Sequence, residues 1–88
     1  MSTLNGESIL ITGGTGSFGR AFARYALDNL DPPRLVVYSR DEVKQLELRR
    51  HLDDDPRLRF FIGDIRDQTR LQRALHGVES VIHCSALK

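Results

Sequence analysis

Residues 11–22 read ITGGTGSFGRAF, and this glycine-rich stretch decides the fold. An apolar, β-branched run precedes it at residues 8–12 and predicts a buried strand, while apolar residues at helical spacing follow it. Gly13, Gly16 and Gly19 therefore lie between a strand and a helix. There, backbone N–H groups and the positive end of the helix dipole can face a phosphate. Gly14, together with Gly16 and Gly19, also satisfies the G-x-G-x-x-G pattern of dinucleotide-binding units.

Four apolar runs alternate with three stretches of helical periodicity along the chain. The predicted strands are residues 8–12, 35–38, 58–62 and 80–84. The predicted apolar helix positions are Phe18, Ala21, Phe22, Tyr25 and Ala26 in the first helix, Val43, Leu46 and Leu48 in the second, and Leu71, Ala74, Leu75 and Val78 in the third. This β-α-β-α-β-α-β order predicts an α/β fold with a Rossmann-like parallel sheet and flanking helices, and an incomplete domain.

The composition narrows the classes of partner and compartment. With 13 basic and 12 acidic residues, the net charge of +1 gives no support for binding to nucleic acid or to a membrane surface. One cysteine, Cys84, excludes an intrachain disulfide, so a cytoplasmic location is expected. No apolar run approaches the ~20 residues of a transmembrane helix, and the N-terminal residues lack the features of a signal peptide. Neither His76 nor His83 has a partner at metal-ligand spacing, so no metal is expected.

The glycine loop has two other interpretations. A nucleotide triphosphatase loop requires Lys and then Ser or Thr after its last glycine, but Arg20 and Ala21 stand there. The hydroxyl that would hold magnesium is therefore missing. A glycine-rich turn that binds nothing is the alternative that the loop by itself leaves open.

The end of the second predicted strand indicates the cofactor. In dinucleotide-binding folds an acid about 20 residues after the glycines binds the ribose 2′-hydroxyl, whereas an arginine accommodates a 2′-phosphate. Here the position holds Ser39 and Arg40, with Lys44 one helical turn further on, which favours NADP over NAD. The alternative is a capping box formed by Ser39 and Glu42, with Asp41 near the helix start.

The end of the third predicted strand reads Gly63-Asp64-Ile65. A carboxylate at Asp64 can accept from the adenine amino group while Ile65 packs on the ring. Asp64 and Asp67 are otherwise ordinary turn and cap residues, and Asp67 is predicted to cap the third helix.

These motifs together resemble one family. TGGTGSFG, VYSRDEVKQ, FFIGDIRD and VIHCSALK are similar, in order and spacing, to the N-terminal part of the inverting UDP-N-acetylglucosamine 4,6-dehydratases. That family belongs to the extended short-chain dehydrogenase/reductase superfamily and serves bacterial surface-polysaccharide biosynthesis. The similarity covers nearly the whole chain after Glu7.

The resemblance implies roles for individual residues. Thr15, Gly16, Ser17 and Phe18 would lie along the NADP pyrophosphate, Ser39, Arg40, Asp41, Glu42, Val43 and Lys44 around the 2′-phosphate, Asp64 and Ile65 at the adenine, Cys84 on the nicotinamide side, and Lys88 against the substrate. Cys84 and Ser85 stand where the family usually has alanine. The simpler interpretation of Cys84 is a small buried apolar residue.

The resemblance also implies a reaction. NADP⁺ takes hydride from C4 of the UDP-sugar, water is lost across C5 and C6, and hydride returns to C6 with inversion at C5. The family uses a Tyr-x-x-x-Lys pair, which this chain lacks, because Asn29 and Glu42 stand four residues after the two tyrosines. Residues 1–88 are therefore expected to be an N-terminal NAD(P)-binding segment, inactive alone, with the catalytic and substrate parts absent.

Two alternatives to this dehydratase segment stay open. One is a segment of a related NAD(P)-dependent sugar-nucleotide epimerase or reductase. The other is a non-enzymatic dinucleotide-binding module. In each case the exposed edge of an unfinished sheet at residues 80–84 would allow a homo-oligomer to form.

Overall fold

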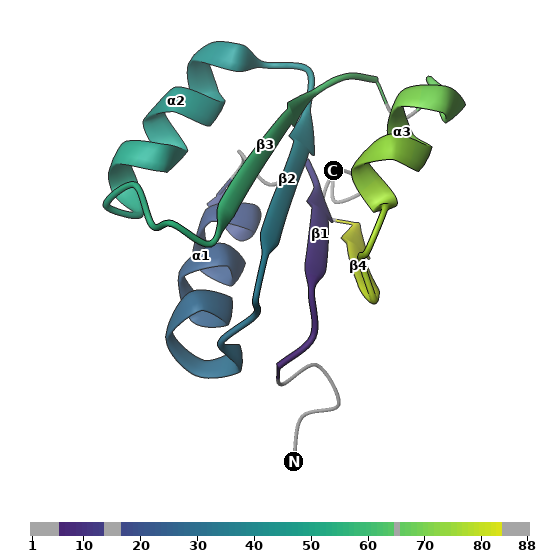
Figure 1. Ribbon diagram of the computed structural model, residues 1–88. Coiled ribbons are helices and arrows are strands. Elements are labelled where there is room, and N and C mark those ends of the chain that lie inside the picture. Colours follow the sequence, from purple (N-terminus) through teal and green to yellow (C-terminus); the bar gives the residue numbers. More distant parts are fainter. Residues whose placement is uncertain (1–5, 14–16, 65, 84–88) are drawn as a thin grey trace.

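The computed structural model describes residues 6–13, 17–64 and 66–83 of the 88-residue chain (Figure 1). Within these ranges, four strands form one parallel sheet in the order β3-β2-β1-β4. The strands are β1 (Ile9–Thr12), β2 (Leu35–Ser39), β3 (Leu58–Ile62) and β4 (Ser80–His83). The helices are α1 (Ser17–Tyr25), which continues into the π-helical turn η1 (Ala26–Leu30), α2 (Glu42–His51) and α3 (Gln68–Leu75). The predicted α/β, Rossmann-like architecture is confirmed.

Helices cover both faces of the sheet, with α1 and α2 on one face and α3 on the other (Figure 1). Successive strand side chains point to opposite faces, and β1, β2 and β3 each contribute to two cores. Ile9 and Ile11 of β1 pack in the core beneath α1, η1 and α2. Leu10 of β1 packs with Val36 and Ala74 beneath α3. The central strands β1 and β2 are buried on both faces, which explains why their sequences are almost continuously apolar rather than alternating.

The buried face of α1 differs from the predicted one. Phe18 and Tyr25 are more than half exposed and Ala21 is exposed, while Phe22 is only partly buried. The residues that face the core from α1 and η1 are Gly19, Ala23, Ala26, Leu27 and Leu30. The buried face begins at Gly19, and a pattern built on apolar side chains cannot register a glycine as one of its members.

The second helix also departs from the sequence prediction. Val43 is 67% exposed and Leu46 is 47% exposed, whereas Leu48 and the polar Gln45 are buried. The alternative of a capping box at Ser39 and Glu42 is not formed: the N-cap is Asp41, whose Oδ1 accepts a hydrogen bond from Lys44 N at 3.0 Å. Ser39 remains in β2, where its register partner is Ile62 of β3. Strand pairing therefore continues past the point where a cap at Ser39 would have started the helix.

The third helix agrees with the sequence prediction. Ala74 is buried, and Leu71, Leu75 and Val78 pack against the same core. Asp67 caps α3 as predicted, since its Oδ1 accepts from Arg70 N at 3.1 Å. Gly77 follows the helix with φ of 78°, a left-handed conformation that favours glycine.

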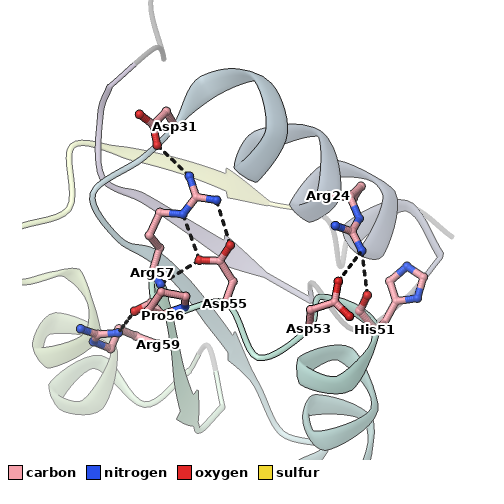
Figure 2. A network of polar contacts seen from close by, with 8 residues as sticks. All are labelled: Arg24, Asp31, His51, Asp53, Asp55, Pro56, Arg57 and Arg59. Carbon is pink, nitrogen blue, oxygen red and sulfur yellow. Dashed lines mark hydrogen bonds and ion pairs between the residues drawn. The ribbon is translucent and has the colours of Figure 1, made fainter.

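A network of ion pairs and hydrogen bonds joins the loops where β2 and β3 begin (Figure 2). The guanidinium of Arg57 donates from Nε and Nη2 to both carboxylate oxygens of Asp55, at 2.9 and 2.8 Å. Its Nη1 donates to Asp31, the residue after η1, at 2.7 Å. A bidentate pair of this kind is stronger than an ordinary surface ion pair, so Arg57 links the η1–β2 and α2–β3 connections.

Replacing Asp55 with asparagine should lower the free energy of unfolding at pH 7 by about 1–2 kcal/mol. Hydrogen bonding to Arg57 holds the pKa of Asp55 at about 2, below its ordinary value of 3.8. Ionised Asp55 thus stabilises the fold above its unfolded-state pKa, and this contribution is lost as the pH falls toward 2. Urea titrations at pH 7 and pH 3 should show that the wild type loses more stability on acidification than the variant.

Asp54→Asn is the matched control for that substitution. Its side chain is 82% exposed, and its left-handed φ of 51° is tolerated by asparagine. We expect its unfolding midpoint to stay near the wild-type value. Equal losses for the two variants would contradict the assigned role of Asp55.

Candidate functional site

The carboxyl ends of the parallel strands bring the predicted site residues to one edge of the sheet. Gly13 follows β1, Arg40 follows β2, and Asp64 follows β3 after one glycine. In the order β3-β2-β1-β4 the chain progresses outward from β1 to β3 and then returns to the other side of β1. In open α/β sheets, ligands bind at this reversal, outside the carboxyl ends of the strands.

The glycine loop begins in the conformation expected of it. Gly13 has φ of 67°, which side-chain-bearing residues rarely adopt, and its N–H donates to Tyr38 O at 3.1 Å. The helix α1 starts at Ser17, where Ser17 and Phe18 are exposed, and Gly19 is buried against the sheet. Gly14, Thr15 and Gly16 lie outside the described residues. The described part of the loop therefore has the strand, turn and helix order that a phosphate-binding loop requires.

The end of β2 presents a half-buried hydroxyl and an exposed cation. Ser39 is half-buried, and the side chain of Arg40 is 74% exposed. Arg40 Nη1 lies 3.5 Å from Asp64 Oδ2, so the structure brings together two residues that the sequence assigned to neighbouring parts of one nucleotide. The other predicted members of this group lie exposed at the N-cap and first turn of α2: Asp41, Glu42, Val43 and Lys44.

Asp64 is held by a residue that sequence reasoning missed. Its Oδ1 accepts from Arg66 N at 2.9 Å and from Arg66 Nε at 3.2 Å, and its Oδ2 accepts from Arg66 Nη2 at 3.0 Å. Hydrogen bonds from Arg66, with a smaller contribution from the charge of Arg40, lower the pKa of Asp64 to about 2. The carboxyl is therefore an ionised acceptor at neutral pH. The signal for this pair was the arginine two residues after the aspartate in GDIRD.

Tyr38 and Gly63 fit closely beneath Asp64. The Tyr38 ring is fully buried, and its hydroxyl donates to Asp64 O at 2.9 Å. Burial is the main cause that raises the pKa of Tyr38. A Cβ placed on Gly63 would lie 2.5 Å from the Tyr38 hydroxyl oxygen, so only glycine allows this approach. The close fit fixes the backbone from which the Asp64 side chain projects.

The end of β4 adds a histidine that was not among the predicted site residues. Thr12 Oγ1 and His83 Nδ1 form a hydrogen bond between register partners of β1 and β4, at the reversal of strand order. The remaining predicted site residues Ile65, Cys84 and Lys88 lie outside the described residues. In the described ranges no group of three or more metal-ligating side chains lies together, and no helix there is long and apolar enough to cross a membrane.

Known proteins that are similar to this chain include enzymes named for their action on sugar nucleotides. A family model described as "Polysaccharide biosynthesis protein" matches residues 9–88. The chain is 48% identical over 84 residues to the UDP-N-acetylglucosamine 4,6-dehydratase (inverting) of Campylobacter jejuni, covering 96% of this chain and 25% of that protein. It is 42% identical over 85 residues to the UDP-glucose 4-epimerase of Rickettsia felis, with coverages of 93% and 25%. The chain thus spans about a quarter of the length of these relatives.

Solved structures share the fold. Pen from Bacillus thuringiensis superposes with a TM-score of 0.87 at 32% identity, over 100% of this chain and 27% of that one. A wide-type short-chain dehydrogenase/reductase from Veillonella parvula, solved in complex with NADP, gives a TM-score of 0.74 at 19% identity, over 88% and 34%. The resemblance to the inverting UDP-N-acetylglucosamine 4,6-dehydratases, drawn from the sequence motifs, is confirmed by the family model and by the Campylobacter jejuni relative.

Gly63→Ala should lower the free energy of unfolding by about 1–3 kcal/mol, because the added methyl group overpacks against the Tyr38 hydroxyl. Removing that hydroxyl relieves the nearest clash, so Gly63→Ala should cost less in a Tyr38→Phe background. Denaturant titrations of the two single variants and the double variant measure the difference. Identical costs in both backgrounds would show that the contact between Gly63 and Tyr38 does not limit this position.

Proposed function

The chain belongs to the polysaccharide biosynthesis protein family, and on this premise we propose that residues 1–88 are the N-terminal NADP-binding segment of a sugar-nucleotide 4,6-dehydratase. The lyase would act on UDP-N-acetylglucosamine with inversion at C5, as the name of the Campylobacter jejuni relative suggests. The observation that carries the cofactor assignment is the approach of Arg40 to Asp64 across the carboxyl ends of β2 and β3.

The glycine loop would hold the pyrophosphate. Gly13 turns the backbone at the end of β1, and Ser17, Phe18 and Gly19 open α1 behind it. The N-terminal N–H groups of a helix have no partners within the helix and attract an anion. Thr15 and Gly16 would complete the loop. These residues fit a diphosphate because they offer backbone donors and little side-chain bulk.

The end of β2 would hold the ribose 2′-phosphate. Arg40 has a long, exposed side chain, and its guanidinium group can form a bidentate contact with phosphate oxygens. Ser39 offers a hydroxyl beside it, and the proposed set around the phosphate also includes Asp41, Glu42, Val43 and Lys44. An acid at Arg40's position would instead favour the NAD ribose, so the residue present supports NADP.

The end of β3 would hold the adenine. Ionised Asp64 can accept a hydrogen bond from the exocyclic amino group, and Arg66 keeps its carboxylate in one orientation. Ile65 would pack on the ring. Asp64 also forms an ion pair with Arg40. The adenine and 2′-phosphate ends of the nucleotide would therefore be bound by one connected set of charges.

When bound, the nicotinamide would accept a hydride from the sugar and return it during the dehydration. The residues of this chain would bind and orient the nucleotide, with Cys84 on the nicotinamide side and Lys88 against the UDP-sugar. No Tyr-x-x-x-Lys pair occurs in the sequence, so the chain by itself is proposed to be inactive. A cytoplasmic location and a homo-oligomer with a contact along residues 80–84 complete the proposal.

Arg40→Ala should weaken NADP⁺ binding by roughly ten- to a hundredfold, because a charged hydrogen bond is lost, and should leave NAD⁺ binding within about twofold. Isothermal titration calorimetry with both nucleotides measures the two dissociation constants. Arg50→Ala is the matched control, since Arg50 is an exposed cation in the last turn of α2, away from the site. An equal loss for NADP⁺ and NAD⁺ in Arg40→Ala would contradict the phosphate assignment.

A sugar-nucleotide epimerase is the second candidate, favoured by the 42% identity to the Rickettsia felis relative. Incubation of the whole protein that contains this chain with UDP-N-acetylglucosamine and NADP⁺ separates the candidates when the products are resolved by chromatography and weighed by mass spectrometry. A dehydratase yields a product lighter by one water, whereas an epimerase yields an isomer of unchanged mass. Nucleotide binding without either product would support a non-enzymatic dinucleotide-binding module.

A further inference from the structure

Gln45 is a buried amide beside the proposed 2′-phosphate site. It lies on the second turn of α2 and is only 5% exposed, at a position where the helix faces the sheet. In the described ranges the other buried polar residues are Ser8 and Thr12. Burying an amide is unfavourable unless its hydrogen bonds are formed, so the contacts of Gln45 need an account.

The neighbours of Gln45 determine which way its amide points. Nε2 lies 2.9 Å from the carbonyl oxygen of Phe61 in β3, and a backbone carbonyl can only accept. The NH₂ group, not the amide oxygen, must therefore face β3. The same nitrogen lies 2.9 Å from Ser39 Oγ and 3.5 Å from Ser39 O, so its second hydrogen is donated mainly to the nearer Ser39 hydroxyl.

This donation sets the polarity of the Ser39 hydroxyl. A hydroxyl has one hydrogen and two lone pairs, and here one lone pair is taken by Gln45. The amide nitrogen cannot accept, so the hydroxyl hydrogen is left for another partner. Ser39 is half-buried next to Arg40, so that hydrogen is available to a ligand at the end of β2.

We infer that Gln45 is a positioning residue that makes the Ser39 hydroxyl a donor toward a phosphate monoester at the nucleotide 2′ position. This assignment rests on the proposed NADP-binding function. A phosphate dianion only accepts hydrogen bonds, so a hydroxyl held as a donor is matched to it. The 2′-hydroxyl of NAD can both donate and accept, so it gains less from that fixed polarity.

Gln45→Met removes the amide while keeping an unbranched side chain of similar length. We expect it to weaken NADP⁺ binding by roughly three- to tenfold and NAD⁺ binding by less than about twofold, and Ser39→Ala to do the same. Since Gln45 acts through Ser39, the double variant should lose no more selectivity than the larger single loss. Calorimetry with both nucleotides gives the ratio of the two dissociation constants for each protein.

Leu48→Ala provides the matched structural control. Leu48 is buried on the same helix but packs in the apolar core, so its truncation destabilises α2 without touching the hydroxyl. We expect its ratio of dissociation constants to equal that of the wild type. Incomplete folding leaves this ratio unchanged, because an unfolded fraction lowers the apparent affinity for both nucleotides by the same factor.

Gln45→Glu serves if the methionine variant does not fold. It keeps the shape of the side chain and replaces the donor beside Ser39 with an acceptor, but it also adds a negative charge, so it is measured with and without Ser39→Ala. NADP⁺ should lose more affinity than NAD⁺ with Ser39 present, and the part of this selective loss that acts through the hydroxyl should disappear in the Ser39→Ala background. An unchanged ratio in the Gln45 variants, or additive losses in the double variant, would overturn the role of Gln45. A wild-type protein that binds neither nucleotide would instead overturn the proposed function, and this assignment with it.

Discussion

The parallel pairing of β2 with both β1 and β3 is the constraint on which the site depends. The register sets Thr12 beside Tyr38 and Ser39 beside Ile62, so the chain leaves all three strands at one edge of the sheet. Tyr38 connects the exits directly, because its carbonyl accepts from Gly13 N and its hydroxyl donates to Asp64 O. One buried residue of the central pair therefore fixes both the start of the glycine loop and the loop that carries the carboxylate.

Charged groups at the two ends of the sheet have different tasks. At the amino end, Arg57 pairs with Asp55 and Asp31. These contacts link the α2–β3 connection to the η1–β2 connection. At the carboxyl end, Arg40 and Arg66 share Asp64 while Arg40 stays largely exposed. In the first arrangement the Arg57 side chain is 28% exposed and contacts two carboxylates, whereas in the second the Arg40 side chain is 74% exposed and remains accessible. This difference separates a structural ion pair from a cation that a ligand could contact, in a chain with nearly balanced charge.

The sequence predicted the four strands and their alternation with three helices, because apolar runs, glycines and prolines act locally on the backbone. It was less successful with helix faces. In α1 the buried strip begins at Gly19, and in α2 it includes Gln45, so neither position looks apolar in the sequence. The positions of Arg40 and Asp64 after two strands could be predicted from the fold class alone. The roles of Arg66 and Gln45 could not, because each depends on hydrogen bonds whose geometry appears only when loop, helix and strand are assembled.

The Arg40–Asp64–Arg66 cluster carries two guanidinium groups around one carboxylate. The Asp64 carboxylate is a counterion that belongs to the protein itself, and it competes with every anion that approaches Arg40. Inorganic phosphate or a nucleic-acid strand would have to displace that internal competitor with charge alone. A nucleotide carrying its own amino group can engage the carboxylate and the guanidinium at once. If the proposed nucleotide binds here, the cluster would favour a ligand with donor and acceptor groups in matching places over other polyanions.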